Sequence, residues 1–385
     1  MNTVLILGGK LQGVDAVYLM KKAGWKTIVV DKKKDVPASD MADVFLNFDI
    51  LNKEKLENIM KVVDFIIPAL EDELILDVIY EEARHLNKAI MFSPSSYKIS
   101  CSKIKSDKLF ERLEIPAPKY WPNCEFPIIV KPSNLSGSEK VFKFYNKKDF
   151  EEFLKINGSK EKWVIQEYLK GPSYSIEIIA KNGIMKTFQV TELEMDEFYD
   201  CKRVLCPSLL PINLEKIFSE YASKLAEAVS LDGIMDVEVI LSNGKLKVLE
   251  IDARIPSQTL SAVYKSTKII APNVYFSDLK SEDIMEFTNI RGRGVVYEHI
   301  LVTENKIKVC GEHIMGINGP LKHVYNFFGA DEALTNYEPN KKSWVATLII
   351  SDENREKAWK KHLMVIEQIK KIKKIDIYED LYPID

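Results

Sequence analysis

Over residues 1–97, short apolar runs alternate with longer amphipathic stretches. Apolar positions recur at helical spacing over residues 12–23, which predicts a helix there. The apolar runs have the length of β-strands and lie at residues 4–7, 27–31, 44–48, 63–69 and 89–92. Alternating strands and helices predict a parallel, doubly wound sheet, in which ligands bind at the carboxyl ends of the strands.

Candidate ligand-binding residues follow three of these predicted strands. The first strand runs into Gly8-Gly9-Lys10-Leu11-Gln12-Gly13, where glycines let the backbone approach a ligand and a helix start offers N–H groups to an anion. Asp31 ends the second strand, where a dinucleotide-binding fold places a ribose-binding acid, and Glu71 follows the fourth. Because the spacing is Gly-Gly-x-x-x-Gly and not Gly-x-Gly-x-x-Gly, a nicotinamide oxidoreductase is a minor alternative.

From residue 98 to residue 290 the pattern changes to strands bordered by small polar loops. An apolar strand ends in Val130-Lys131-Pro132, and a loop rich in serine follows at residues 133–138. A basic strand end beside such a loop can hold a polyphosphate by charge and by backbone donors. A further apolar strand covers residues 163–169. Its backbone and its acid, Glu167, can contact the edge of an adenine and a ribose.

The most informative stretch is residues 233–258, which the alternation of apolar positions around an Asn-Gly turn predicts to be a β-hairpin. Side chains two apart on a strand point to one face, so Glu250, Asp252 and Arg254 project together and Glu238 joins them from the paired strand. Carboxylates so placed repel one another unless a hard cation such as Mg²⁺ neutralises them, and an adjacent arginine suits an oxyanion. The alternative is a solvated acidic hairpin without a ligand.

The last region, residues 291–385, predicts a smaller α/β unit. Strands are expected at residues 294–302, 306–310 and 344–350, and a helix with lysines on its outer face at residues 354–374. The charged face is expected to be solvated, and a homodimer contact through this region is left open.

Composition narrows the class of protein. The chain has 385 residues and 46% hydrophobic residues, which suggests two or three domains with substantial cores. Its net charge of −3 gives no indication of a nucleic-acid partner, and no apolar run reaches membrane-spanning length. The N-terminus is expected to be a strand and not a signal peptide, and the five scattered cysteines are expected to be reduced thiols in the cytoplasm.

Taken in order, these motifs resemble the ATP-grasp superfamily, whose metal signature is usually written Glu-x-Asn-x-Arg. Asp252 stands where Asn is usual, which keeps an oxygen ligand. The order of the motifs is Lys103, Val-Lys131-Pro, Ser136 to Ser138, Gln-Glu167-Tyr-Leu, Glu238 and Glu250-x-Asp252-x-Arg254. The resemblance implies an α/β protein with an N-terminal doubly wound parallel-sheet domain (1–97), an ATP-grasp α+β module (98–290) and a C-terminal α/β portion (291–385).

Within that superfamily, the chain more closely resembles the lysine ligases of pyrrolysine biosynthesis. The matching segments are GGKLQG at the start, residues 198–201, residues 233–238 and residues 250–259. The resemblance implies an ATP-dependent ligase that joins (3R)-3-methyl-D-ornithine to the ε-amine of L-lysine through an acyl phosphate, with ADP and phosphate as products. Its partners would be small amino acids, with no nucleic acid and no membrane.

The resemblance also implies roles for individual residues. Arg254 and Lys131 would act in catalysis, and Glu238, Glu250 and Asp252 would hold one or two Mg²⁺ ions. ATP would contact Lys10, Asp31, Asp49, Lys103, Lys131, Ser136, Gly137, Ser138, Gln166, Glu167, Tyr168 and Leu169. The amino-acid substrates would contact Leu11, Gln12, Glu71, Glu177, Asp200, Asp236 and Ser257.

Two further alternatives come from different classes of protein. The first is another ATP-grasp enzyme, such as a dipeptide ligase or a carboxyphosphate-forming enzyme acting on a nucleotide precursor. A nucleotide-binding regulatory protein without turnover would be expected to have a damaged metal site, and the acids at Glu238, Glu250 and Asp252 are all present.

Overall fold

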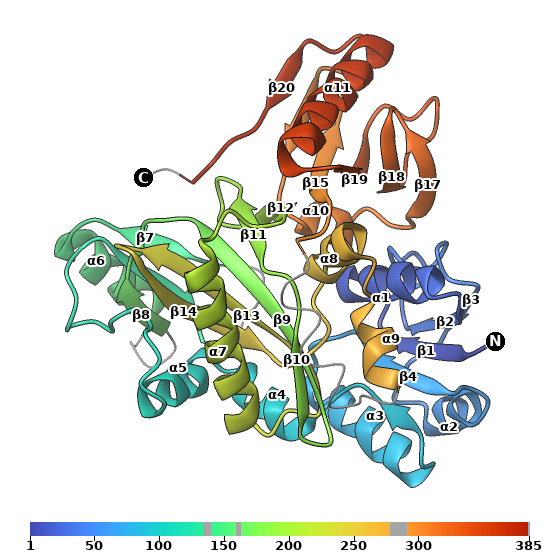
Figure 1. Ribbon diagram of the computed structural model, residues 1–385, viewed down its shortest axis with the longest axis horizontal. Coiled ribbons are helices and arrows are strands. Elements are labelled where there is room, and N and C mark those ends of the chain that lie inside the picture. Colours follow the sequence, from blue (N-terminus) through green and yellow to red (C-terminus); the bar gives the residue numbers. More distant parts are fainter. Residues whose placement is uncertain (134–139, 159–162, 278–290, 384–385) are drawn as a thin grey trace.

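The computed structural model of the chain describes residues 1–133, 140–158, 163–277 and 291–383 (Figure 1). Three sheets organise these residues. All five cysteines are free thiols. Among the described residues, no helix is both long and apolar enough to cross a membrane.

The first sheet is parallel and lies at the N-terminal end of the chain. Its five strands have the order β3-β2-β1-β4-β5, and its helices pack on both faces, which confirms the predicted doubly wound sheet. The strands are β1 (Thr3–Leu7), β2 (Lys26–Asp31), β3 (Val44–Asn47), β4 (Phe65–Pro68) and β5 (Ala89–Ile90). The helices are α1 (Leu11–Lys22), α2 (Lys53–Lys61) and α3 (Glu73–His85).

A small antiparallel sheet follows after two short helices. The helices are α4 (Pro94–Ser100) and α5 (Lys103–Arg112). The strand order is β7-β6-β8, from β6 (Ile128–Pro132), β7 (Phe142–Phe144) and β8 (Trp163–Glu167). Helix α6 (Lys147–Asn157) inserts Phe150 into the aromatic core of this unit, so the small sheet has a hydrophobic core of its own.

Twelve of the described strands form one large, mainly antiparallel sheet. Its path is β14-β13-β9-β11-β12-β15-β19-β18-β17, and β10, β16 and β20 pair beside it. The strands that precede residue 278 are β9 (Ser173–Lys181), β10 (Ile184–Thr187), β11 (Thr191–Met195), β12 (Cys201–Cys206), β13 (Gly233–Ser242) and β14 (Lys245–Asp252). Those that follow residue 290 are β15 (Gly294–Val302), β16 (Lys306–Val309), β17 (Lys322–Phe327), β18 (Ala330–Thr335), β19 (Trp344–Asp352) and β20 (Ile377–Glu379).

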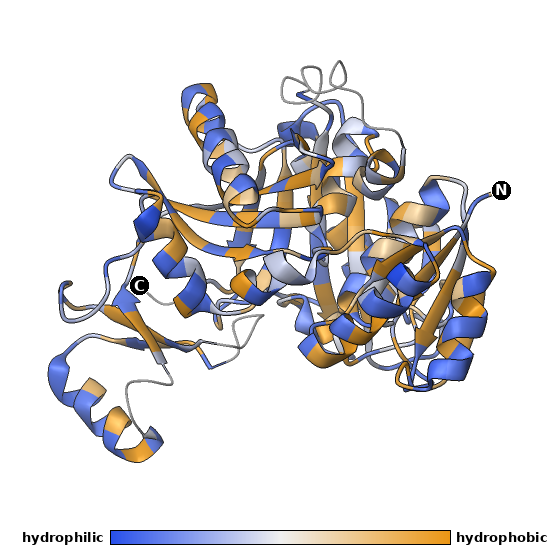
Figure 2. Ribbon diagram, turned by 90° about the horizontal axis from the view of Figure 1, so that it is seen from below, coloured by the Kyte–Doolittle hydropathy of each residue, from blue (hydrophilic) through white to orange (hydrophobic). Residues whose placement is uncertain are grey.

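Helices cover the large sheet along its length. The helices of the molecule carry both apolar and polar residues along their length (Figure 2). Those on the large sheet are α7 (Ile212–Ala228), α8 (Thr259–Thr267), α9 (Ala271–Phe276), α10 (His313–Gly316) and α11 (Arg355–Lys373). The large sheet contains strands from both sides of residue 290. The domain boundaries at 97/98 and 290/291 stay predictions.

The acidic hairpin predicted from the sequence is confirmed. Strands β13 and β14 pair in antiparallel register and are joined by Asn243 and Gly244, with φ of 51° and 74°. Two successive positive φ angles are what a type I′ turn needs, and Asn-Gly tolerates them. Strands β17 (KHVYNF) and β18 (ADEALT) were not predicted, because neither shows a clear alternation of apolar and polar residues.

A buried ionic cluster joins the first sheet to the large one. Glu332 of β18 accepts from Lys265 (2.6 Å), from His323 (2.7 Å) and from the Tyr18 hydroxyl (3.1 Å), and it pairs with Lys22 of α1 at 2.6 Å. Burial alone would raise the pKa of Glu332, but these donors outweigh it and hold that pKa well below its usual range. The cluster therefore fixes α1 against the far strands while keeping Glu332 charged.

We expect Glu332→Gln to lower the free energy of unfolding by about 3 kcal/mol, because the variant leaves buried cations without their counter-charge. Thermal and urea unfolding measure this. The matched control is Glu338→Gln, which removes an exposed acid paired with Lys322 at 3.6 Å. Because the folded pKa of Glu332 is depressed, its contribution is complete above the ordinary carboxyl pKa and is lost as the pH falls through the folded value. Equal destabilisation by both variants would contradict this role.

Candidate active site

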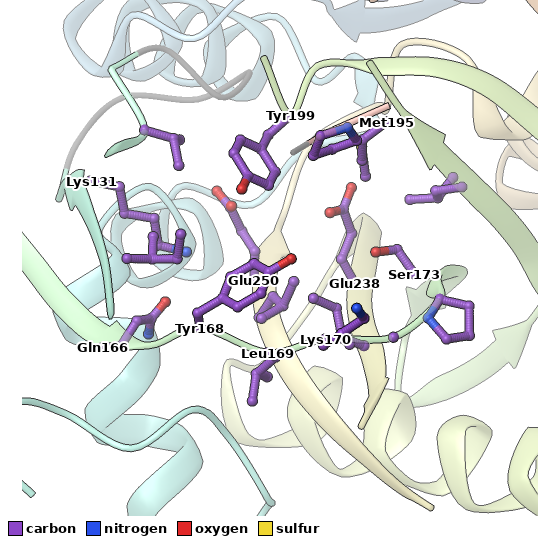
Figure 3. Close-up of a pocket in the computed structure, with 18 of the residues that line it drawn as sticks. Lys131, Gln166, Tyr168, Leu169, Lys170, Ser173, Met195, Tyr199, Glu238 and Glu250 are labelled. Atoms are coloured by element: carbon purple, nitrogen blue, oxygen red, sulfur yellow. The ribbon is translucent and has the colours of Figure 1, made fainter. Parts of the chain in front are cut away.

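A cavity of about 570 Å³ lies between the small sheet and the hairpin (Figure 3). The small sheet contributes Lys131 and the stretch Gln166–Leu169, and the hairpin contributes Glu238 and Glu250. Gln166 is 2% exposed, and its Nε2 has no hydrogen-bond partner among the described residues. A buried amide donor without a partner beside an apolar wall is suited to a planar, polar-edged ligand such as a base.

Two lysines face the acids of this cavity. Lys103, the first residue of α5, contacts Glu250 with Nζ to Oε1 at 2.5 Å, and Lys131, the residue before the end of β6, also lines the cavity. Burial lowers the pKa of Lys131. Burial also disfavours the charged form of Lys103, but Glu250 and then Asp252 outweigh it and raise that pKa. The two ammonium groups are therefore placed to meet an anion that enters beside the hairpin.

The acids of the hairpin stand in two rows across neighbouring strands. Glu238 pairs in register with Glu250, and Asp236 with Asp252, while Glu177 of β9 lies opposite Asp236. Figure 3 shows the Glu238 and Glu250 carboxylates pointing into the cavity from adjacent strands. The predicted convergence of Glu238, Glu250 and Asp252 on one side of the hairpin is thus reproduced.

The pKa values of these acids reflect their burial first and the neighbouring charges second. Burial, followed by repulsion from Glu250, raises the pKa of Glu238 to about 8. Burial also raises the pKa of Asp252 to about 7, although Arg254 opposes it. Glu250 differs because Lys103 and Lys131 outweigh its burial and lower its pKa. One more positive charge beside Glu238 would relieve this repulsion.

The chemistry of these acids fits a magnesium ion bound together with phosphate. Among the described residues, no three acidic, histidine or cysteine side chains already form a coordination cage, since Glu250 pairs with Lys103 and Asp252 with Arg254. Mg²⁺ does not require one, because it usually takes one or two carboxylates and completes its shell with water and substrate phosphates. The metal role of Glu238, Glu250 and Asp252 stays a prediction.

A second cavity of about 120 Å³ adjoins the first and shares Glu238 and Glu250 with it. Three predicted substrate contacts line it, namely Asp200, Asp236 and Ser257, as do Arg254 and Glu312. Oδ1 of Asp236 and Oε2 of Glu312 are buried and have no hydrogen-bond partner among the described residues. Because an unpartnered buried carboxylate is costly, these oxygens are suited to receive the ammonium group of a ligand.

The first sheet reaches this second cavity through Arg254. Oε1 of Glu71, in the loop after β4, accepts from Gln12 Nε2 and pairs with Arg254 Nη2, both at 2.7 Å. Arg254 also pairs with Asp252 at 3.1 Å. The structure therefore brings Gln12 and Glu71 to the hairpin, and Leu11 begins the same helix, α1.

Other predicted ATP contacts are placed differently. Lys10, Asp31 and Asp49 are not among the residues that line the larger cavity. Asp31 accepts from the backbone N–H of Gly9 and of Lys33, both at 2.9 Å, and Asp49 from that of Leu51 at 3.0 Å. These aspartates shape loops at the carboxyl edge of the first sheet, and their contact with ATP stays a prediction. Ser136, Gly137 and Ser138 lie outside the described residues.

Of the remaining predicted residues, Glu167 and Asp200 line the cavities, and Glu177 lines neither. Glu167 lines the larger cavity, and its carboxylate pairs with Lys247 at 2.5 Å. Glu177 is fully buried and accepts from the Ser175 hydroxyl at 3.0 Å, and burial raises its pKa to about 7. Asp200 accepts from the His313 backbone N–H at 3.2 Å.

Sequence reasoning missed several acids of the site. Glu312, which precedes α10, lines the smaller cavity, and burial raises its pKa to about 7. Glu192 and Glu194 of β11 line the larger cavity. None lies in a motif, and only the pairing of distant strands places them here. The alternation Glu-x-Glu at residues 192–194 was the one available signal.

Comparison with known proteins matches two family models to the chain. One is described as "PylC-like, N-terminal domain" and matches residues 4–89. The other is described as "ATP-grasp domain" and matches residues 101–258. The second model covers the small sheet, the hairpin and both lysines of the larger cavity.

Relatives match along nearly the whole chain. The 3-methyl-D-ornithine–L-lysine ligase of Methanosarcina mazei is 33% identical over 93% of this chain and 93% of its own. The corresponding ligase of Methanosarcina barkeri is 32% identical over 84% of this chain and 87% of its own. The crystal structure of an L-amino acid ligase from Bacillus licheniformis shares the fold, with a TM-score of 0.69 at 14% identity over 96% of this chain and 98% of that one.

These matches confirm the resemblance expected from the sequence, together with the predicted α/β fold and the prediction of an ATP-grasp ligase that forms a carbon–nitrogen bond. The chain belongs to the ATP-grasp superfamily and, within it, to the family of the 3-methyl-D-ornithine–L-lysine ligases.

Proposed function

We propose that the protein joins (3R)-3-methyl-D-ornithine to the ε-amine of L-lysine, with ATP as the energy source and Mg²⁺ as the metal. The observation that carries the proposal is the pair of adjoining cavities that share Glu238 and Glu250. One has a buried amide and two lysines suited to a nucleotide, and the other has buried acids suited to ammonium groups.

Formation of the amide requires activation of the carboxylate of the ornithine-like substrate, because a carboxylate is a poor electrophile. In the first step its oxygen attacks the γ-phosphorus of ATP, the bond to the β-phosphate oxygen breaks and ADP leaves. In the second step the amine attacks the acyl carbon, inorganic phosphate leaves and the amine loses a proton. Neither step needs a covalent intermediate on the enzyme, so the protein must align the reactants, neutralise charge and exclude water.

Lys103 and Lys131 are placed to bind the phosphates, since both line the larger cavity beside the acid rows. A magnesium ion held by Glu238, Glu250 and Asp252 would supply charge neutralisation between phosphate oxygens. Arg254, in the smaller cavity, is suited to stabilise the oxyanion that forms when the amine attacks. Lys103, Lys131 and the magnesium ion would thus act on the phosphates, and Arg254 on the oxyanion.

The two amino acids would occupy opposite sides of the acyl phosphate. Asp236 and Glu312, which line the smaller cavity, would receive the ammonium groups of the ornithine-like substrate. Glu177 lies opposite Asp236 on β9 without lining the cavity, and its contact with substrate stays a prediction. Glu71 would bind the α-ammonium of lysine, with the Leu11 backbone and Gln12 nearby, and leave the ε-amine to point toward the hairpin. The cytoplasmic location and the homodimer contact considered from the sequence stay predictions.

We expect Glu250→Gln to reduce the rate of ADP release by at least about a hundredfold, because Lys103 loses its counter-charge and the metal site loses an anionic ligand. A coupled ADP-release assay with both amino acids measures this. Glu304→Gln, an exposed acid between β15 and β16, is the control. Full activity of the Glu250 variant in Mg²⁺ would refute the proposed metal site.

We expect Lys131→Ala to raise the dissociation constant for ATP about tenfold, because a charged donor to the phosphates is lost. Titration calorimetry without amino-acid substrates isolates this effect. Lys148→Ala, an exposed lysine of α6, should bind ATP like the wild type. Unchanged affinity in the Lys131 variant would remove this lysine from the nucleotide site.

We expect Glu71→Gln to raise the KM for lysine about tenfold and the KM for ATP much less, because it removes a ground-state contact to one substrate. Glu73→Gln, an exposed acid of α3, is the matched control. Fragmentation of the product by mass spectrometry should show an ε-linked amide. Equal increases in both KM values would instead show that Glu71 acts through Arg254, and an α-linked product would contradict the proposed orientation of lysine.

A further inference from the structure

The segment after β20 connects the far end of the large sheet with the larger cavity. In Figure 1 it leaves β20 beside α11 and runs toward the half of the molecule that holds β7, β11 and β14. Tyr382 and Pro383 line the larger cavity, and Glu194 and Met195 of β11 line the same cavity. Residues remote from every ATP-grasp motif therefore form part of its wall.

Lys202 of β12 holds this segment in place. Its side chain is fully buried, and every partner of its ammonium within the described residues belongs to the segment. Nζ donates to Asp380 Oδ1 and to the Leu381 carbonyl, both at 2.6 Å, and lies 3.2 Å from the centroid of the Tyr382 ring. If the segment detached, Lys202 would lose its ion pair with Asp380, its hydrogen bond to Leu381 and its contact with the Tyr382 ring. These contacts hold the segment against β12.

Arg203 links the same segment to the cavity acid Glu194. Its Nη2 donates to Asp380 Oδ2 at 2.8 Å, and its Nη1 pairs with Glu194. The Tyr382 hydroxyl donates to Glu194 Oε2 at 3.2 Å. The segment therefore both covers one side of the cavity and restrains an acid that faces it.

We propose that residues 380–383 build one wall of the nucleotide cavity through Tyr382 and Pro383 and that Tyr382 is a positioning residue that sets the affinity for ATP. Tyr382 is half exposed, lines the cavity, packs its ring against the Lys202 ammonium and donates its hydroxyl to Glu194. The wall borders only the larger of the two cavities, because neither Tyr382 nor Pro383 lines the smaller one. The inference rests on the proposed function, since it takes the larger cavity to be the ATP site.

The test compares three variants of the full chain. Tyr382→Ala removes both the ring and the hydroxyl, and Tyr382→Phe removes the hydroxyl alone. Ile377→Ala, at an exposed position of β20 remote from the cavity, is the matched control. For each, calorimetry gives the dissociation constant for ATP, steady-state assays give the KM for each substrate, and thermal unfolding reports the fold.

We expect Tyr382→Ala to raise the dissociation constant and the KM for ATP about tenfold, with kcat and the KM for lysine unchanged. Tyr382→Phe should raise the dissociation constant about twofold, because the ring remains. Ile377→Ala should match the wild type. A Tyr382→Ala variant with wild-type affinity for ATP, or with equal increases in the KM for ATP and the KM for lysine, would overturn the proposed role of Tyr382 in ATP binding. Absence of ATP binding by the wild type would overturn the proposed function and this inference together.

Discussion

The repulsion among the carboxylates of β9, β13 and β14 is the constraint on which the site depends. Asp236 faces Glu177 on one side and Asp252 on the other, and Glu238 faces Glu250. Acids in register on adjacent strands destabilise a sheet unless positive charge is supplied. Burial raises the pKa of Glu238 and of Asp252, and Glu250 raises both further, while Lys103 acts against both shifts and Arg254 against that of Asp252.

Each layer of the fold brings positive charge to these acids from a different direction. Helix α5 supplies Lys103 and the small sheet supplies Lys131, both at the larger cavity. The chain after β14 supplies Arg254, which also meets Glu71 of the first sheet. A cation held between phosphate and carboxylate would complete the compensation, so the charge that remains uncompensated in the protein is suited to a nucleotide with its metal.

The region after residue 290 contributes to this arrangement and does not simply cover it. Glu312 adds a buried acid to the smaller cavity. Glu298 is fully buried and accepts from Arg203 Nε at 2.5 Å and from His362 Nε2 at 2.7 Å, so the network that begins at Asp380 continues inward through Arg203. Glu332 fixes the first sheet to β18 through Lys22. These contacts join residues 64 or more positions apart, so they make the relative placement of the sheets part of the site.

The sequence alone determined the local elements and the chemistry of the hairpin. Apolar periodicity predicted the five parallel strands, and the Asn-Gly turn with alternating acids predicted β13, β14 and their shared face, because these features depend on residues close together in the chain. Tertiary structure alone decided that Glu312 and Tyr382 line the cavities and that Asp31 and Asp49 do not. Those positions follow from strand pairing and buried ion pairs between distant segments, and no local pattern of residues encodes which distant partner a buried charge will find.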